Sequence, residues 1–182
     1  MRVIAGQYRR RNLKINEKSK QIRPTGDRVK EGLFNILQRY LEGSSVLDLF
    51  SGSGALGIEA LSRGATHVVF VENHRDSIKD LQENLTSLKI PESQYTIMTM
   101  DVRQSYKKLS SFEFDLVFAD PPYDSTWYDT LEIDLPLIPL KQDGICSIET
   151  SYQKDLNQTV DGFEFLEKRK YGHTALQFYK KL

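Results

Sequence analysis

Two short motifs in this chain carry residue types that could hold and orient reacting groups. The first, VLDLFSGSG at residues 46–54, is an apolar run with one acid that leads into a glycine-rich turn. Glycine permits the backbone angles and the close ligand approach that such a turn needs. The second, DPPY at residues 120–123, follows the apolar run FDLVFA. Its two prolines remove two amide donors and leave carbonyls and a carboxylate as acceptors beside an aromatic ring. Such a site is suited to receiving an NH2 group.

The glycine motif by itself allows more than one kind of ligand. Gly52, Gly54 and Gly57 spell G-x-G-x-x-G, and Glu72 follows about 20 residues later, which fits the dinucleotide fingerprint. A nicotinamide-dependent oxidoreductase is therefore an alternative interpretation. Asp48 argues against it, because a carboxylate there would lie close to a pyrophosphate, and it suits the cationic amino group of S-adenosylmethionine better. A glycine turn with no ligand also stays open, since a lone fingerprint is a weak signal.

The elements that must position these motifs can be predicted from periodicity. Strands are predicted at residues 45–50, 67–72, 95–100, 114–119, 144–149, 163–170 and 176–179, and helices at residues 27–41, 55–63, 75–88, 102–109 and 127–135. The alternation predicts an α/β fold of parallel βαβ units, with both motifs at the carboxyl ends of strands, where such sheets bind ligands. The last two strands lack an intervening helix and should form an antiparallel hairpin. Residues 2–15 predict a small β-hairpin around residues 6–11.

Net charge is zero, but its distribution along the chain is uneven. Residues 1–30 hold ten Lys or Arg against two acids, and the remainder holds 15 against 23. Such asymmetry indicates a basic face for nucleic acid. Arg9, Arg10 and Arg11, with Lys14 nearby, are candidates for contacts with phosphates. The other interpretation is a solvated edge hairpin that its charges protect from aggregation.

The remaining composition favours a compact protein without metal or membrane anchor. Cys146 is the one cysteine, so no internal disulfide is expected, and the three histidines show no metal-ligand spacing. No apolar stretch approaches the length that spans a membrane, and the amino terminus has no apolar run. We expect a monomeric, cytoplasmic protein.

Together the motifs carry a family resemblance. Residues 120–123 resemble the D/N/S-P-P-Y/F motif of class I S-adenosylmethionine-dependent amino-methyltransferases. RVIAG at residues 2–6, RPT at 23–25, DRVKE at 27–31 and YGHT at 171–174 resemble, more narrowly, the bacterial 16S rRNA guanine-N2 methyltransferase family of RsmD type. The chain departs from the family pattern at two positions: Ser51 stands where Ala is commoner, and His173 stands where Asp is common. The resemblance covers nearly the whole chain. It implies a Rossmann-like, seven-stranded, mostly parallel sheet with helices on both faces, in a domain of residues 26–182 after a basic hairpin appendage of residues 1–25.

The resemblance also implies roles for individual residues. S-adenosylmethionine would contact Asp48, Phe50, Ser51, Gly52, Ser53, Gly54, Glu72, Asn73, Asp101 and Val102. Glu72 would accept hydrogen bonds from ribose hydroxyls and Asp101 from the adenine amino group, although either acid could instead cap a helix. The catalytic residues would be Asp120, Pro121, Pro122 and Tyr123.

In the methyl transfer that the resemblance implies, Asp120 and the Pro121 carbonyl would accept the two N–H hydrogens of the target amine, while Tyr123 would stack on the base. Ribosomal RNA, within a small-subunit particle, would contact Arg9, Arg10, Arg11, Lys14, Arg23 and Arg28. Alternatives are an adenine-N6 methylase of DNA or RNA, a protein-glutamine methylase, which more typically has Asn at the position of Asp120, a nicotinamide oxidoreductase, and a non-catalytic RNA-binding module.

Overall fold

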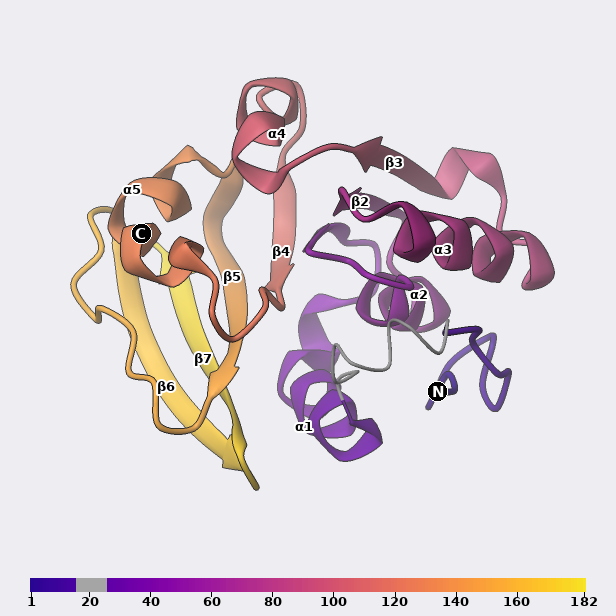
Figure 1. Ribbon diagram of the computed structural model, residues 1–182, viewed down its shortest axis with the longest axis horizontal. Coiled ribbons are helices and arrows are strands. Elements are labelled where there is room, and N and C mark those ends of the chain that lie inside the picture. The colour runs from indigo at the N-terminus through magenta and orange to yellow at the C-terminus, as the bar shows by residue number, and fades with distance from the viewer. Residues whose placement is uncertain (16–25) are drawn as a thin grey trace.

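The apolar runs of the sequence form the strands of one sheet. The computed structural model describes residues 1–15 and 26–182. Within these residues the sheet has seven strands, β1 (Ser45–Leu49), β2 (His67–Glu72), β3 (Tyr95–Thr99), β4 (Phe114–Ala119), β5 (Leu140–Ser151), β6 (Phe163–Tyr171) and β7 (Thr174–Lys181). Their order is β3-β2-β1-β4-β5-β7-β6 (Figure 1). Neighbours among β1 to β5 are parallel, and β7 is antiparallel to β5 and β6. The predicted fold class is confirmed.

Helices cover both faces of this sheet. The α-helices of the described residues are α1 (Asp27–Leu37), α2 (Ala55–Ser62), α3 (Arg75–Ser87), α4 (Val102–Leu109) and α5 (Leu131–Asp134). Side chains of a strand point alternately to its two faces. In β4, Phe118 therefore joins the apolar cluster under α1, α2 and α3, and Val117 joins the cluster under α4 and α5. The interior strands are buried on both faces, as in other parallel sheets.

Two predicted helices differ from the observed elements. The helix predicted at residues 27–41 ends at Leu37 and continues as a 3-10 turn, Gln38–Tyr40. The helix predicted at residues 127–135 is wrong as one element: a 3-10 helix, Thr126–Thr130, precedes the short α5, and another, Leu135–Leu137, follows it. Leu135 keeps helical angles, with φ −63° and ψ −43°, but Pro136 has no N–H donor with which to continue the hydrogen bonds of α5.

The predicted amino-terminal hairpin is short, with one antiparallel bridge between Arg2 and Asn12. Backbone hydrogen bonds flank this bridge, from the Val3 N–H to the Arg11 carbonyl at 2.9 Å and from the Leu13 N–H to the Met1 carbonyl at 2.8 Å. The N–H groups of Ile4 and Ala5 donate to the Glu59 carboxylate of α2, at 2.8 and 3.0 Å. The hairpin is thus also held against α2.

A buried ion pair fixes this segment further. Lys30 of α1 and Glu59 are fully buried, with Nζ 3.5 Å from Oε2, and Lys30 also donates to the Arg2 carbonyl at 2.6 Å. Burial lowers the pKa of Lys30, while Glu59 opposes that shift. Removing one partner of a buried pair is costly. Residues 1–15 therefore have a defined position on α1 and α2, and the domain boundary at residue 25 stays a prediction.

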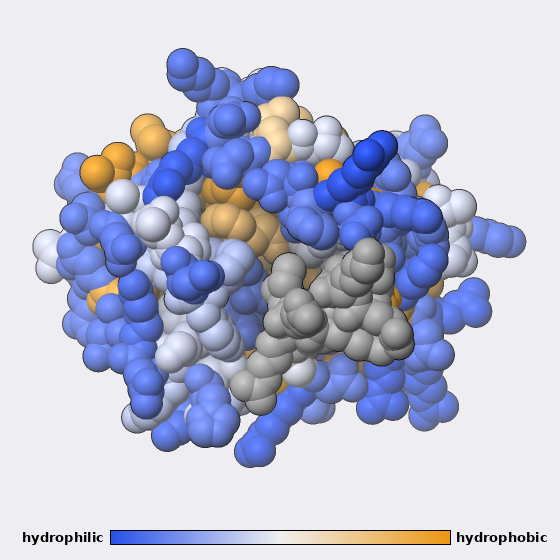
Figure 2. Space-filling view, viewed as in Figure 1, coloured by the Kyte–Doolittle hydropathy of each residue, from blue (hydrophilic) through white to orange (hydrophobic). Residues whose placement is uncertain are grey.

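The outer surface is mainly polar. Figure 2 shows a largely hydrophilic face on which apolar residues emerge in a few places. Among residues 1–15 and 26–182, no helix combines the length and the apolar character needed to cross a membrane. The same residues hold no cluster of three or more potential metal ligands.

Candidate active site

A cavity of about 270 Å³ lies at the carboxyl ends of β1, β2 and β4. Its lining includes, from the predicted set, Asp48, Phe50, Ser51, Gly52, Ser53, Glu72, Asn73, Asp120 and Pro122. The glycine motif and the DPPY motif meet here because β1 and β4 are adjacent parallel strands, with Leu49 paired to Ala119. The residues that follow the two strands are therefore neighbours at the same edge of the sheet.

The three glycines of the first motif are needed for different structural reasons. Gly52 has a φ of +54°, and a Cβ at this position would meet nothing within 4 Å. At Gly54, with a φ of +82°, a Cβ would lie 2.3 Å from a methyl carbon of Leu81. A Cβ at Gly57 would lie 2.3 Å from the Phe70 ring. Gly54 allows α3 to pack closely on the glycine turn, and Gly57 allows α2 to pack closely on β2. Gly52, which lines the cavity, leaves room for a ligand.

Phe50 carries backbone strain at the end of β1. It is not glycine, yet its φ is +58°, in the left-handed region. Its ring packs edge-on against Trp127, with the centroids 5.7 Å apart. Strained backbone of this kind persists only where surrounding packing holds it, and it concentrates at functional sites. The Trp127 contact supplies such packing at the cavity wall.

Four acidic side chains are among the described residues that line the cavity. Asp48, Glu72, Asp80 and Asp120 line it, and the described lining residues include no Lys or Arg. Asp48 is 1% exposed and accepts a hydrogen bond from the Gly57 N–H at 2.8 Å. Burial raises the pKa of Asp48 to about 8; the Gly57 hydrogen bond opposes the shift, and the charges of Asp120 and Glu72 add to it. A cationic ligand would favour the ionised form of Asp48.

Glu72 organises the backbone on two sides of the cavity. Its Oε2 accepts from the Gly52 N–H at 2.7 Å, and its Oε1 accepts from the N–H groups of Asn73 and His74 at 2.9 and 2.8 Å. A carboxylate has about four acceptor positions. One position on Oε2 is therefore left for a ligand hydroxyl, and the ribose contact of Glu72 stays a prediction.

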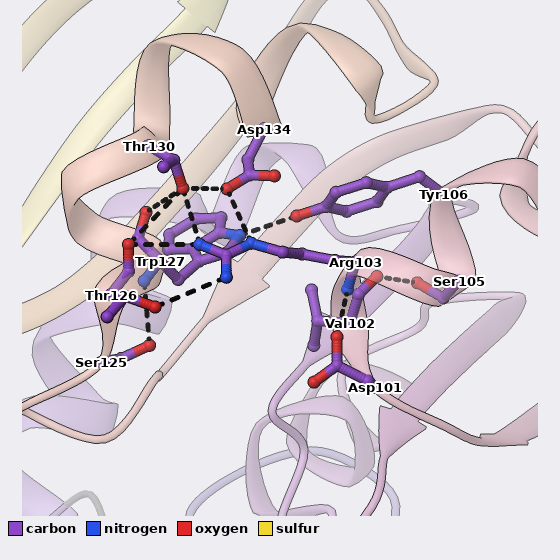
Figure 3. A network of polar contacts seen from close by, with 10 residues as sticks. All are labelled: Asp101, Val102, Arg103, Ser105, Tyr106, Ser125, Thr126, Trp127, Thr130 and Asp134. Carbon is purple, nitrogen blue, oxygen red and sulfur yellow. Dashed lines mark hydrogen bonds and ion pairs between the residues drawn. The ribbon is translucent and has the colours of Figure 1, made fainter.

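Asp101 begins α4 as its N-cap, accepting from the Arg103 N–H at 2.9 Å. Neither Asp101 nor the buried Val102 belongs to the described lining of the cavity, so their cofactor contacts stay predictions. Arg103 links this helix start to the chain beyond the DPPY motif (Figure 3). Its guanidinium donates to Thr130 Oγ1 at 2.7 Å and to the Thr126 carbonyl at 3.2 Å, and it pairs with Asp134 at 3.4 Å.

A buried tyrosine supports the backbone of the DPPY motif through a hydrogen bond. The Tyr128 hydroxyl lies 2.9 Å from the Pro121 carbonyl and 3.0 Å from the Glu149 carbonyl of β5, and can donate to either. Burial, followed by the nearby Asp120 charge, raises the pKa of Tyr128 far above its ordinary value, so the hydroxyl keeps its proton. Tyr123 is 45% exposed, and its hydroxyl lies 3.1 Å from Thr174 Oγ1. Its ring is thus open to solvent.

The predicted RNA-binding residues fall into three groups. Arg9, Arg10, Arg11 and Arg28 are exposed. Lys14 is paired with Glu83 of α3, so its charge is partly compensated. Arg23 lies outside the described residues. No structural observation tests the RNA contacts of these residues, which stay predictions.

Some cavity residues were missed by the sequence reasoning, namely Met1, Ile15, Ala55, Leu56, His74, Ser77 and Asp80. For α3 a signal existed. Ser77, Asp80 and Asn84 lie in the same buried stripe as Leu81 and Leu85, and polar residues on the buried face of an amphipathic helix indicate a site. No local pattern could have placed Met1 or Ile15, because their position depends on contacts with α1, α2 and α3.

Comparisons with known proteins agree on one family. The family model described as conserved hypothetical protein 95 matches residues 1–180. A Haemophilus influenzae protein named ribosomal RNA small subunit methyltransferase D is 36% identical, over 99% of this chain and 93% of its own. The Escherichia coli K12 protein of the same name is 30% identical, over 100% and 90%. The solved structure of a hypothetical protein from Thermus thermophilus superposes with a TM-score of 0.84 at 26% identity, covering 98% of both chains.

Proposed function

The chain belongs to the family described as conserved hypothetical protein 95, and from this premise we propose a reaction for it. The protein transfers a methyl group from S-adenosylmethionine to the N2 amine of a guanine in small-subunit ribosomal RNA. The motifs at the two ends of the chain predicted this family. The observation that carries the proposal is the carboxylate-lined cavity with Asp120 at its wall. Such a cavity suits a cationic methyl donor beside an amine acceptor.

The donor set of the cavity fits S-adenosylmethionine, which has a sulfonium and an ammonium group and supplies an electrophilic methyl group when bound. Asp48 and Glu72 would hold it, with Gly52 giving the space for close approach. A dinucleotide would instead bring a negatively charged pyrophosphate toward Glu72 and the buried Asp48, and an anion there would further disfavour the ionised form of Asp48. This favours S-adenosylmethionine over a nicotinamide cofactor.

The chemistry of the protein in this reaction is alignment and charge stabilisation. The Asp120 carboxylate would accept one N–H of the target amine and stabilise the positive charge that develops on nitrogen. The Pro121 carbonyl has two lone pairs, of which Tyr128 uses at most one, so the other could accept the second N–H. The exposed ring of Tyr123 could stack on a base that has left its helix or stack.

Ribosomal RNA is the acceptor that the relatives' names and the charge distribution favour together. Two relatives at 36% and 30% identity are named as ribosomal RNA small subunit methyltransferases. Exposed Arg9, Arg10 and Arg11 lie in the same anchored segment as Met1 and Ile15, which line the cavity. Phosphate contacts by this segment would therefore hold the RNA beside the site of reaction.

The test uses the purified protein and two separable measurements. Isothermal titration should show binding of S-adenosylmethionine but not of NAD. Tritiated methyl transfer should label 16S ribosomal RNA from unmethylated small subunits, and nuclease digestion should yield N2-methylguanosine. Label in N6-methyladenosine would replace the guanine assignment and keep the reaction class, whereas binding of NAD alone would overturn the whole proposal.

A further inference from the structure

The YGHT motif near the carboxyl end has no role in the proposed reaction, yet it lies beside the DPPY motif. Residues 171–174 form the turn between β6 and β7. The Tyr123 hydroxyl contacts Thr174 Oγ1 at 3.1 Å, and the His173 carbonyl accepts from the Tyr152 N–H at 2.8 Å. Tyr123 and Tyr152 thus flank the dipeptide 173–174, and both residues are exposed, at 45% and 42%.

This region forms a wall beyond the edge of the sheet that carries Asp120. Ala119, the last residue of β4, pairs with Ile148, whereas β5 continues to Ser151, which pairs with Thr174. At about 3.3 Å per residue, β5 extends roughly 10 Å past the end of β4. The β6–β7 hairpin also reaches past β4 (Figure 1).

Two lysines of β6 place their ammonium groups over the Tyr152 ring, Lys168 at 5.1 Å from its centroid and Lys170 closer, but they differ in what these groups can still bind. Lys168 donates to the carbonyls of Tyr152 and Lys154, at 2.8 and 3.0 Å, and to Asp155 at 2.6 Å, which uses its three donors. Lys170 Nζ lies 3.7 Å from the centroid of the Tyr152 ring and takes part in no ion pair among the described residues. Lys168 therefore fixes the segment that follows β5. The ammonium group of Lys170, which has no ion-pair partner among the described residues, can still bind a phosphate.

We propose that Tyr152 and Lys170 form a second RNA-binding site, which stacks an unpaired nucleotide beside the target base and contacts its phosphate. An exposed ring next to a cation is the combination that binds single-stranded nucleic acid without reading its sequence. The inference rests on the proposed function in one respect, namely that the target base enters at Asp120. It goes beyond that function by assigning an unpaired RNA segment and a site outside the basic amino-terminal segment.

The test compares Tyr152→Ala, Tyr152→Phe and Lys170→Ala with the wild type, and takes Lys108→Ala as a charge-matched control. Lys108 is exposed in the last turn of α4. Fluorescence anisotropy measures binding of a short single-stranded RNA and of an RNA duplex, without any methyl transfer. Titration of S-adenosylmethionine into each variant checks that the fold and the cavity are intact.

Loss of one stacked base should weaken binding of the single strand by about 5- to 150-fold in Tyr152→Ala, and Tyr152→Phe should bind like the wild type. Lys170→Ala should reduce the slope of log affinity against log salt by about 0.7. In methyl transfer, both alanine variants should raise KM and leave kcat at saturating RNA unchanged.

Wild-type affinity and salt slope in both alanine variants would overturn the inference. If the wild type itself transfers no methyl group to RNA, the proposed function fails, while the anisotropy measurement still tests this site. A defect confined to assembled small-subunit particles, with naked RNA bound normally, would assign the surface to a protein partner and overturn the RNA site.

Discussion

The hydroxyl of Tyr128 lies 2.9 Å from the carbonyl oxygen of Pro121, so a buried side chain seven residues downstream supports the backbone of the DPPY motif. The same hydroxyl lies 3.0 Å from the Glu149 carbonyl of β5. The acceptor geometry of the candidate active site therefore depends on a residue that does not line the cavity in the described part of the chain.

Tyr128→Phe should lower kcat by about 2- to 10-fold, because one hydrogen bond that orients the Pro121 carbonyl is lost. Affinity for S-adenosylmethionine should be unchanged. Tyr106→Phe is the matched control, since its buried hydroxyl accepts from Trp127 Nε1 and does not contact Pro121. Equal losses of kcat in the two variants would indicate a general packing effect and remove the positioning role.

Asp120→Ala should reduce the rate of methyl transfer by about 10² or more, the scale seen when one oriented charge-stabilising group is removed. Cofactor affinity should change little by comparison. Asp124→Ala removes an exposed carboxylate from the same loop, outside the described cavity lining, and should transfer methyl groups at the normal rate. Near-normal turnover in Asp120→Ala would exclude a catalytic role for Asp120.

Cofactor affinity should rise with pH through Asp48. Burial raises the pKa of Asp48 to about 8, so below that pH the free protein mainly holds the protonated acid. A cationic ligand favours the carboxylate, and binding then releases a proton, so affinity increases as pH rises. Titration between about pH 6 and 7.5, below the usual pKa of an α-amino group, should show this slope. In Asp48→Asn affinity should be lower and the slope absent; a slope that survives would point to another group.

Asn84 connects the glycine loop with the amino-terminal segment. Its amide donates to the carbonyls of Ser53 and Lys14, each at 3.0 Å, and accepts from the Lys14 N–H at 2.7 Å. Asn84→Ala should lower the free energy of unfolding by about 1–3 kcal/mol, because buried backbone groups lose their partners. Cofactor affinity should fall as well. Thr86→Ala, at an exposed position of the same helix, should leave both quantities unchanged in denaturant titration and calorimetry.

Replacing the arginine cluster should change the salt dependence of RNA binding without changing the affinity for S-adenosylmethionine. If Arg9, Arg10 and Arg11 contact phosphates, each lost contact should reduce the slope of log RNA affinity against log salt by about 0.7 to 0.9. The triple change to Ala should raise KM and spare S-adenosylmethionine binding. Replacing Lys107 and Lys108 of α4 by Ala provides the control for lost charge. An unchanged slope in the triple variant would make the cluster a solvated edge.

The sequence by itself determined the sheet and the place of the two motifs. Strands β2 and β4 were predicted with their observed bounds because each has a mainly apolar run, broken in β4 only by Asp115, that ends at a polar residue. The carboxyl ends of parallel strands share one edge. That rule is enough to bring Asp48, Glu72 and Asp120 to a common site.

Only the tertiary structure decided what else surrounds the site. Met1, Ile15 and Asp80 reach the cavity through long-range contacts, for which sequence periodicity has no signal beyond the polar residues buried in α3. The position of the amino-terminal hairpin depends on the Glu59 carboxylate of α2, which accepts from the N–H groups of Ile4 and Ala5. The hydrogen bonding of the Pro121 carbonyl likewise depends on Tyr128. Hydrogen bonds between distant side chains and the backbone are set by packing rather than by local propensity.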